Sequence, residues 1–144
     1  MPQRDIPTLL ISGDESRFGD SAFKFQKFLV EEANFNPEDV RMIFCTYLGS
    51  RYIVEETQMF FDNLKKQGDS GDVVIAYFGH GGKGSFWPNS VSLTYEEWGR
   101  LINNDGDFIF INQSCYSGSA IHSLRGCGLL PKKGLVIASS QKDE

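Results

Sequence analysis

The chain has 144 residues, about the length of one domain, and its 40% hydrophobic and 23% charged residues are typical of a globular protein. Its 19 acidic residues outnumber 14 basic ones, and the net charge of −5 disfavours binding to nucleic acid or to an anionic membrane. The longest apolar run, Val73–Phe78, is far shorter than the ~20 residues that cross a membrane. We expect one domain over residues 1–144 and, without a signal sequence at the start, a cytoplasmic location.

Five short runs rich in β-branched and aromatic residues are predicted to be strands. In chain order they are Thr8–Ile11, Val40–Cys45, Val73–Phe78, Phe108–Asn112 and Leu135–Ala138. The third and fourth runs are continuously apolar, which is typical of strands that are covered on both faces in a parallel sheet. We therefore expect helices on both faces of this sheet.

The segments between the strands carry the three- and four-residue spacing of amphipathic helices. Between the first two strands, four apolar positions predict a helix over residues 21–33. They are Ala22, Phe25, Leu29 and Ala33. Between the second and third strands, Ile53, Phe60 and Leu64 predict another helix, and Gly68 is its expected stop.

A third helix has the clearest start signal in the sequence. Thr94 and Glu97 have the spacing of a capping box. Leu93 and Trp98 fall at the two positions of a hydrophobic staple. Strands and helices thus alternate with short connections, which predicts an α/β fold with a mostly parallel sheet of about five strands.

Two segments with chemically reactive side chains follow the third and fourth strands. Strand three runs into Gly79–Gly82, which contains His80, and strand four runs into Gln113–Gly118, which contains Cys115. Because parallel strands direct their carboxyl ends to one edge, where ligands bind, both segments are expected at that edge. If the two strands are neighbours, about 4.8 Å apart, the histidine and the cysteine can approach each other.

This pairing is the arrangement that a thiol nucleophile requires. An imidazole beside Cys115 can remove the thiol proton and later return it to a leaving amine, which predicts acyl transfer. Gly81 is expected to let the chain bend tightly after His80, so that its N–H and that of Cys115 face a developing oxyanion.

The other cysteines and the second histidine lack this setting. Cys45 ends a strand and is expected to be a buried hydrophobic residue, and Cys127 is expected in a loop. His122 is expected at the surface. Three cysteines without a C-x-x-C pair fit neither a disulfide framework nor a zinc ribbon.

The glycines around Lys83 also invite a phosphate-loop interpretation, which their spacing excludes. A P-loop has Ser or Thr after its lysine and a helix directly behind it, whereas Gly84 follows Lys83 here. A cysteine phosphatase is disfavoured as well, because Arg125 is too far along the chain to wrap the same loop.

The two segments resemble the histidine and cysteine motifs of the caspase, metacaspase and paracaspase group of cysteine peptidases. The resemblance implies a caspase-like three-layer sandwich, with a small hairpin around Phe86–Leu93. It also implies that Cys115 is the nucleophile, that His80 is the general base and acid, and that the Gly81 and Cys115 amides form the oxyanion hole. Members of the group typically use this dyad without a carboxylate as third member.

The resemblance gives mixed indications about specificity. Gln113 and Arg17 stand where caspases have residues of an Asp-binding pocket, which favours cleavage of protein or peptide substrates after an acidic residue. The Tyr116–Gly118 segment is more similar to metacaspases, which cleave after Arg or Lys. Asp14, Glu15 and Asp20 are expected near the same edge and are candidates for binding a basic substrate or Ca²⁺; no other cofactor is expected.

Members of this group continue beyond the fifth strand, whereas this sequence ends at Glu144. We therefore expect the chain to be a large-subunit-like core whose fifth strand is covered by a small subunit or by a second copy. The alternative is a caspase-like interaction module without catalytic activity.

Overall fold

Five parallel strands form the central sheet of the computed structural model, which describes residues 2–45, 49–69, 71–88, 92–126 and 134–139. In the order β2-β1-β3-β7-β8 the strands span Val40–Phe44, Thr8–Ser12, Val73–Phe78, Phe108–Gln113 and Gly134–Ala138. Every neighbouring pair is parallel. The predicted strands are confirmed to within one residue at each end. Strands β1 and β3 are buried throughout, as expected for strands covered on both faces.

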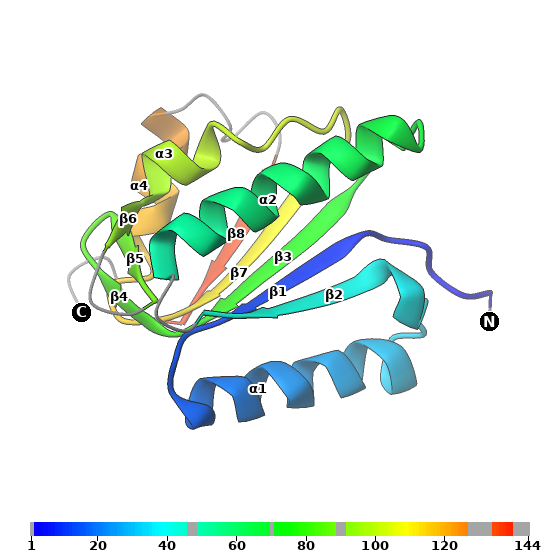
Figure 1. Ribbon diagram of the computed structural model, residues 1–144, viewed down its shortest axis with the longest axis horizontal. Coiled ribbons are helices and arrows are strands. Elements are labelled where there is room, and N and C mark those ends of the chain that lie inside the picture. Colours follow the sequence, from blue (N-terminus) through cyan, green and yellow to red (C-terminus); the bar gives the residue numbers. More distant parts are fainter. Residues whose placement is uncertain (1, 46–48, 70, 89–91, 127–133, 140–144) are drawn as a thin grey trace.

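Helix α1, Ser16–Lys27, covers one face of the sheet and continues into the π-helical turn Phe28–Glu32 (Figure 1). Ala22 and Leu29 are buried against the sheet residues Val74 and Ala76, as the apolar spacing predicted. The helix begins five residues before the predicted start at residue 21. Phe18 in its first turn lies four residues before Ala22 and is partly buried against the same cluster, so the apolar stripe begins earlier than predicted.

Helices α2, α3 and α4 cover the opposite face, and the fold is an α/β arrangement with helices on both sides of a parallel sheet (Figure 1). They span Gly49–Lys66, Tyr95–Gly99 and Ser119–Gly126. Ile53 and Phe61 of α2 and Leu124 of α4 belong to one buried cluster with Ile75 and Phe110 of the sheet. None of the helices in the described residues is long and apolar enough to span a membrane.

The predicted start of α3 is confirmed. The Thr94 hydroxyl accepts a hydrogen bond from the Glu97 N–H at 3.2 Å, and Leu93 and Trp98 are both buried. The Trp98 indole N–H also donates to the Thr57 hydroxyl at 3.1 Å. Because Thr57 belongs to α2, this hydrogen bond ties the two helices together.

A second, antiparallel sheet follows β3 directly. Its strands β4, β5 and β6 span His80–Gly82, Ser85–Trp87 and Leu93–Thr94, so the predicted hairpin also includes the histidine segment. Phe86 of β5 is fully buried and packs edge-on against four aromatic rings at centroid distances of 4.6–5.9 Å. These are Tyr77, Tyr95, Trp98 and Phe110. This contact fixes the small sheet against the large one.

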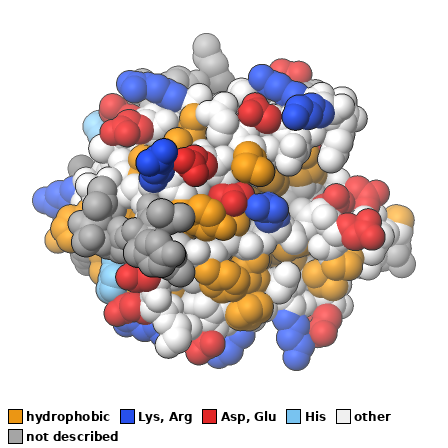
Figure 2. All heavy atoms as spheres, viewed as in Figure 1, with side chains coloured by type: hydrophobic (Ala, Val, Ile, Leu, Met, Phe, Trp, Pro, Cys, Tyr) orange, Lys and Arg blue, Asp and Glu red, His pale blue; other side chains and the backbone are white. Residues whose placement is uncertain are grey.

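Exposed apolar side chains occur over β8 and on the face shown in Figure 2. Leu135 and Ile137 of β8 are 55% and 49% exposed, and they share a face with Ile109 and Ile111 of β7. In Figure 2, hydrophobic side chains also gather near the middle of the face, with acidic and basic side chains interspersed around them. Of the described strands, β8 is at one edge of the large sheet.

Candidate active site

His80 and Cys115 leave neighbouring strands at the same level. Strands β3 and β7 are paired so that Phe78 lies opposite Gln113, and each reactive residue comes two positions later. Both side chains line one cavity of about 340 Å³ at the carboxyl ends of the strands. Its other lining residues are Arg17, Phe18, Gly79, Gln113, Ser114 and Ser139. The structure thus brings together the predicted catalytic pair and the two predicted substrate-binding residues.

Gly81 lies where the histidine segment meets the cysteine segment. A Cβ atom on Gly81 would collide with the Cys115 carbonyl oxygen and would lie 2.7 Å from Ser114 Oγ. The prediction that Gly81 forms a tight bend is wrong, because Gly81 lies in the short strand β4. The physical reason for glycine is the close approach of the two backbones. That the Gly81 and Cys115 amides bind an oxyanion stays a prediction.

The backbone of His80 is held from the core below it. The buried Tyr77 hydroxyl donates to the His80 carbonyl oxygen at 2.7 Å. A Cβ on Gly79 would collide with the same hydroxyl, so only glycine leaves room for it. Tyr77 was expected in a strand, but this contact was not predicted, because an apolar strand pattern does not show which residue a tyrosine hydroxyl reaches.

The imidazole of His80 contacts Glu15, which was expected near this edge as a candidate for binding a basic substrate or Ca²⁺. Nε2 of His80 lies 2.9 Å from Oε2 of Glu15, and the ring of Phe18 meets the imidazole edge-on at 5.0 Å. The resemblance implied a dyad without a carboxylate, whereas here a carboxylate contacts the candidate base. Glu15 follows β1, which lies beside β3, and only the strand order reveals that neighbourhood.

Glu15 also binds Arg17. Oε2 of Glu15 accepts a hydrogen bond from Nε of Arg17 at 3.0 Å and forms an ion pair with Nη2 at 3.0 Å, and the guanidinium lies over the Phe18 ring. The hydrogen bond from Arg17 is the main cause that lowers the pKa of Glu15, and the charges of Arg17 and His80 add to this effect against some desolvation. Glu15 is therefore ionised at neutral pH.

The segment after the cysteine is held in an uncommon conformation. Cys115 is exposed, and Tyr116 after it has a left-handed φ of 56°. The Ser119 hydroxyl donates to the Tyr116 carbonyl at 2.6 Å and accepts from the Gly84 N–H at 2.8 Å. One hydroxyl thus joins the cysteine segment to the turn of the small antiparallel sheet. No signal in the sequence predicts this double contact, because a serine hydroxyl can bond to many different backbone groups.

A chain of buried polar groups supports the cysteine segment from the other side. Ser114 Oγ donates to Asn112 Oδ1 at 2.9 Å, and Asn112 Nδ2 donates to the Tyr95 hydroxyl at 2.9 Å. All three side chains are buried. Buried hydrogen-bonded groups of this kind resist displacement, because a group left without its partner would lose its hydrogen bond without regaining one to water.

Arg17 and Gln113 also line a smaller neighbouring cavity of about 160 Å³ with Phe18, Ser21 and Phe78. A guanidinium and an amide at one cavity are suited to a carboxylate-bearing side chain. A third cavity, of about 260 Å³, lies on the other side of the β1 end. Its charged lining is acidic and comes from Asp14, Glu15 and Asp20.

The acidic cavity does not assemble a metal site within the part of the chain that is described. No group of three or more His, Cys, Asp or Glu side chains comes together there in a geometry that could hold a metal ion.

The remaining candidate residues lie where the sequence predicted, as far as they are described. Cys45 is fully buried directly after β2, and its burial raises the pKa of the thiol to about 12. His122 is exposed on α4. Cys127 lies outside the described residues.

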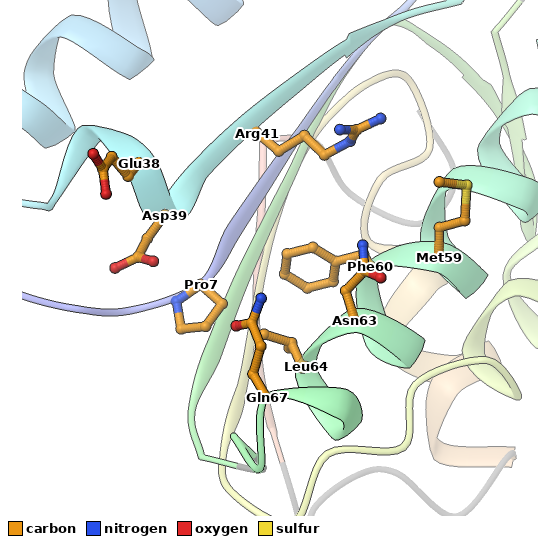
Figure 3. Close-up of a pocket in the computed structure, with 9 residues that line it drawn as sticks. All are labelled: Pro7, Glu38, Asp39, Arg41, Met59, Phe60, Asn63, Leu64 and Gln67. Atoms are coloured by element: carbon orange, nitrogen blue, oxygen red, sulfur yellow. The ribbon is translucent and has the colours of Figure 1, made fainter.

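Another cavity, of about 160 Å³, lies at the opposite end of the sheet between β2 and α2 (Figure 3). Its arginine, Arg41, is paired with the buried Glu56 at 2.6 Å. Met59, Phe60 and Leu64 supply much of the remaining wall. The lining of this cavity contains neither a thiol nor a histidine, unlike the cavity of His80 and Cys115.

Comparisons of the chain with models of protein families, with curated proteins and with solved structures found no match. The chemistry of the site is therefore inferred from its own geometry.

Selective alkylation tests the different surroundings of the two described thiols. We expect iodoacetamide at neutral pH to modify Cys115 at least about 100-fold faster than Cys45, because a raised pKa leaves almost no Cys45 thiolate. Mass spectrometry of the digested protein measures both rates. The same reaction in denaturant should modify Cys45 readily. Equal rates in the folded protein would contradict the described burial.

Replacing Gly81 tests the close contact between the two segments. We expect Gly81→Ala to destabilise the fold by about 1–3 kcal/mol, because the new methyl group meets backbone that must shift. Gly82→Ala is the matched control, since its Cβ would meet the half-exposed Trp87 side chain, which can move. Urea unfolding measures both effects. Equal losses of stability would show that Gly81 is not specially constrained.

Proposed function

We propose that this protein is a cysteine endopeptidase with a caspase-like catalytic core. The observation that carries the proposal is the common cavity of His80 and Cys115 at the ends of two paired parallel strands. The order of elements also supports it. A strand leads to the histidine, a small antiparallel sheet and a helix follow, and the next strand leads to the cysteine.

Each catalytic step follows from the chemistry of these two side chains. His80 accepts the proton of the Cys115 thiol, and the thiolate sulfur bonds to the carbonyl carbon of the scissile peptide. The carbonyl oxygen becomes an oxyanion, to which the Gly81 and Cys115 N–H groups donate. The C–N bond then breaks, and the imidazolium gives its proton to the leaving amine.

The second half of the reaction releases the acyl group. His80 removes a proton from water, and the resulting hydroxide bonds to the carbonyl carbon of the thioester. The C–S bond breaks, and the proton returns to the sulfur of Cys115. The products are a carboxylic acid, an amine and the unchanged enzyme.

The two cavities beside the catalytic pair support different specificities. The cavity with Arg17 and Gln113 is suited to an acidic side chain before the scissile bond, which is the preference that we propose. The acidic cavity with Asp14 and Asp20 favours the alternative, cleavage after Arg or Lys. The exposure of Cys115 and its shared cavity with His80 support a peptidase over a non-catalytic interaction module.

Hydrolysis of peptide panels with Asp, Arg or Lys before the scissile bond tests this proposal. We expect the Asp peptides to be cleaved fastest, Cys115→Ala to abolish cleavage, and His80→Ala to lower kcat by about 10²- to 10⁴-fold, because general base catalysis is lost. Cys45→Ala and His122→Ala are matched controls that remove the same functional groups outside the cavity.

The alternatives predict different outcomes of this assay. Faster cleavage of Arg or Lys peptides would assign the acidic cavity as the specificity site. Equal hydrolysis by the wild type and Cys115→Ala would exclude the cysteine mechanism. A folded protein that cleaves none of the peptides would favour the interaction module.

The proposal includes a second copy of the chain that covers β8. Its support is the exposure of Leu135 and Ile137 on a strand at the sheet edge. We expect light scattering after size-exclusion chromatography to give a mass above the 16.2 kDa of one chain, and Leu135→Lys with Ile137→Lys to restore the monomer. Met59→Lys on α2, also half exposed, is the control. A monomeric wild type would contradict this.

A further inference from the structure

We propose that Glu15 is a positioning residue that holds His80 in the tautomer able to accept the thiol proton, and that Arg17 holds Glu15 in place. This inference rests on the proposed peptidase function. It extends the catalytic pair to a chain of four side chains, which runs from Arg17 through Glu15 and His80 to Cys115.

One carboxylate oxygen of Glu15 contacts both His80 and Arg17. Oε2 of Glu15 lies 2.9 Å from His80 Nε2 and 3.0 Å from both Nε and Nη2 of Arg17. An ionised carboxylate only accepts hydrogen bonds, so the hydrogen between Glu15 and the imidazole belongs to Nε2. In the neutral ring the other nitrogen, Nδ1, then carries the lone pair that accepts a proton.

Contacts from three different elements define the orientation of the imidazole. Glu15 in the segment after β1 binds Nε2, Phe18 of α1 packs edge-on at an interplanar angle of 85°, and Tyr77 of β3 binds the backbone carbonyl. A base whose ring is held on two sides needs little reorganisation before proton transfer, which is the advantage of a third member in a catalytic group.

The proton transfer strengthens the interaction between Glu15 and His80. When the thiol proton moves from Sγ of Cys115 to Nδ1 of His80, the imidazole becomes a cation with hydrogen on both nitrogens. Its positive charge then lies 2.9 Å from a Glu15 oxygen, and the Coulomb attraction stabilises the thiolate–imidazolium pair. Glu15 keeps its charge throughout, and the ring becomes neutral again when the leaving amine takes the proton.

This arrangement gives Arg17 two separable roles. Nε and Nη2 bind Glu15, which leaves the Nη1 amino group to donate to a substrate carboxylate. Its role toward Glu15 affects the rate for every substrate, whereas its role toward a carboxylate affects the binding of acidic substrates alone.

The tautomer of His80 can be measured without any substrate. The ¹⁵N shifts of the ring nitrogens, recorded at about pH 9 where an ordinary histidine is neutral, distinguish Nε2–H from Nδ1–H. We expect wild-type His80 to be Nε2–H, Glu15→Gln to retain part of this preference through its amide oxygen, and Glu15→Ala to give a mixture. The sequence has two histidines, so the exposed His122 serves as an internal reference.

Peptide hydrolysis measures the consequence for catalysis. We expect Glu15→Ala to lower kcat by about 10- to 100-fold with little change in KM, because a displaced base reacts slowly. Arg17→Ala should lower kcat for all peptides and raise KM for Asp peptides only. Glu55→Ala, which removes a carboxylate paired with Arg51 at 3.0 Å on α2, is the matched control.

These variants should remain folded. Glu15 is the N-cap residue of α1, but its side chain makes no capping hydrogen bond there, and the ion pairs that it forms are exposed. Unchanged ¹⁵N shifts in Glu15→Ala, or Nδ1–H in the wild type, would overturn the inference even if Cys115 proves to be the nucleophile. An inactive wild type with the expected tautomer would instead overturn the peptidase proposal.

Discussion

The parallel pairing of β3 with β7 is the constraint on which the candidate site depends. Their register places Phe78 beside Gln113, so two segments distant in sequence leave the sheet together. Strand β3 is buried throughout, whereas in β7 Phe108 and Phe110 are fully buried and the residues that alternate with them are less so. Slipping β7 by one residue would move these two phenylalanines to its more exposed face. The burial that stabilises the sheet therefore also sets the level at which His80 and Cys115 emerge.

Beyond the strand ends, the histidine and cysteine segments lie close together because a glycine leaves room between their backbones and a few hydrogen bonds join them. Gly81 allows the backbones to touch, and the Ser119 hydroxyl bridges Tyr116 and Gly84. Phe86 anchors the small antiparallel sheet in the aromatic core. Core packing and close backbone contacts thus position the site, and the reactive groups lie at the carboxyl ends of β3 and β7, next to the packed core.

The sequence was sufficient to predict the strands and the helices on both faces of the sheet. It was also sufficient to predict several of the residues that meet in the cavity at the sheet edge. These features are local, since β-branched runs, apolar spacing and residues just after a strand can be recognised from neighbouring residues in the sequence. The carboxylate at His80 was not predicted, because Glu15 and His80 are neighbours only through the order of β1 and β3. The role of Gly81 was also misjudged, since it depends on a contact with a segment distant in sequence.

His80 is supported from two sides that differ in their exposure to water. Tyr77 reaches it from the fully buried core, whereas Glu15, with a side chain 47% exposed, reaches it from the surface. Substitutions of Tyr77 would therefore change the stability of the fold and the reactivity of His80 together. Changes at the glutamate are separable from folding, so ionic strength or mutation can tune reactivity there while the scaffold persists. His80 therefore joins a closely packed interior, which tolerates little change, to a solvent-exposed ion pair, which tolerates more.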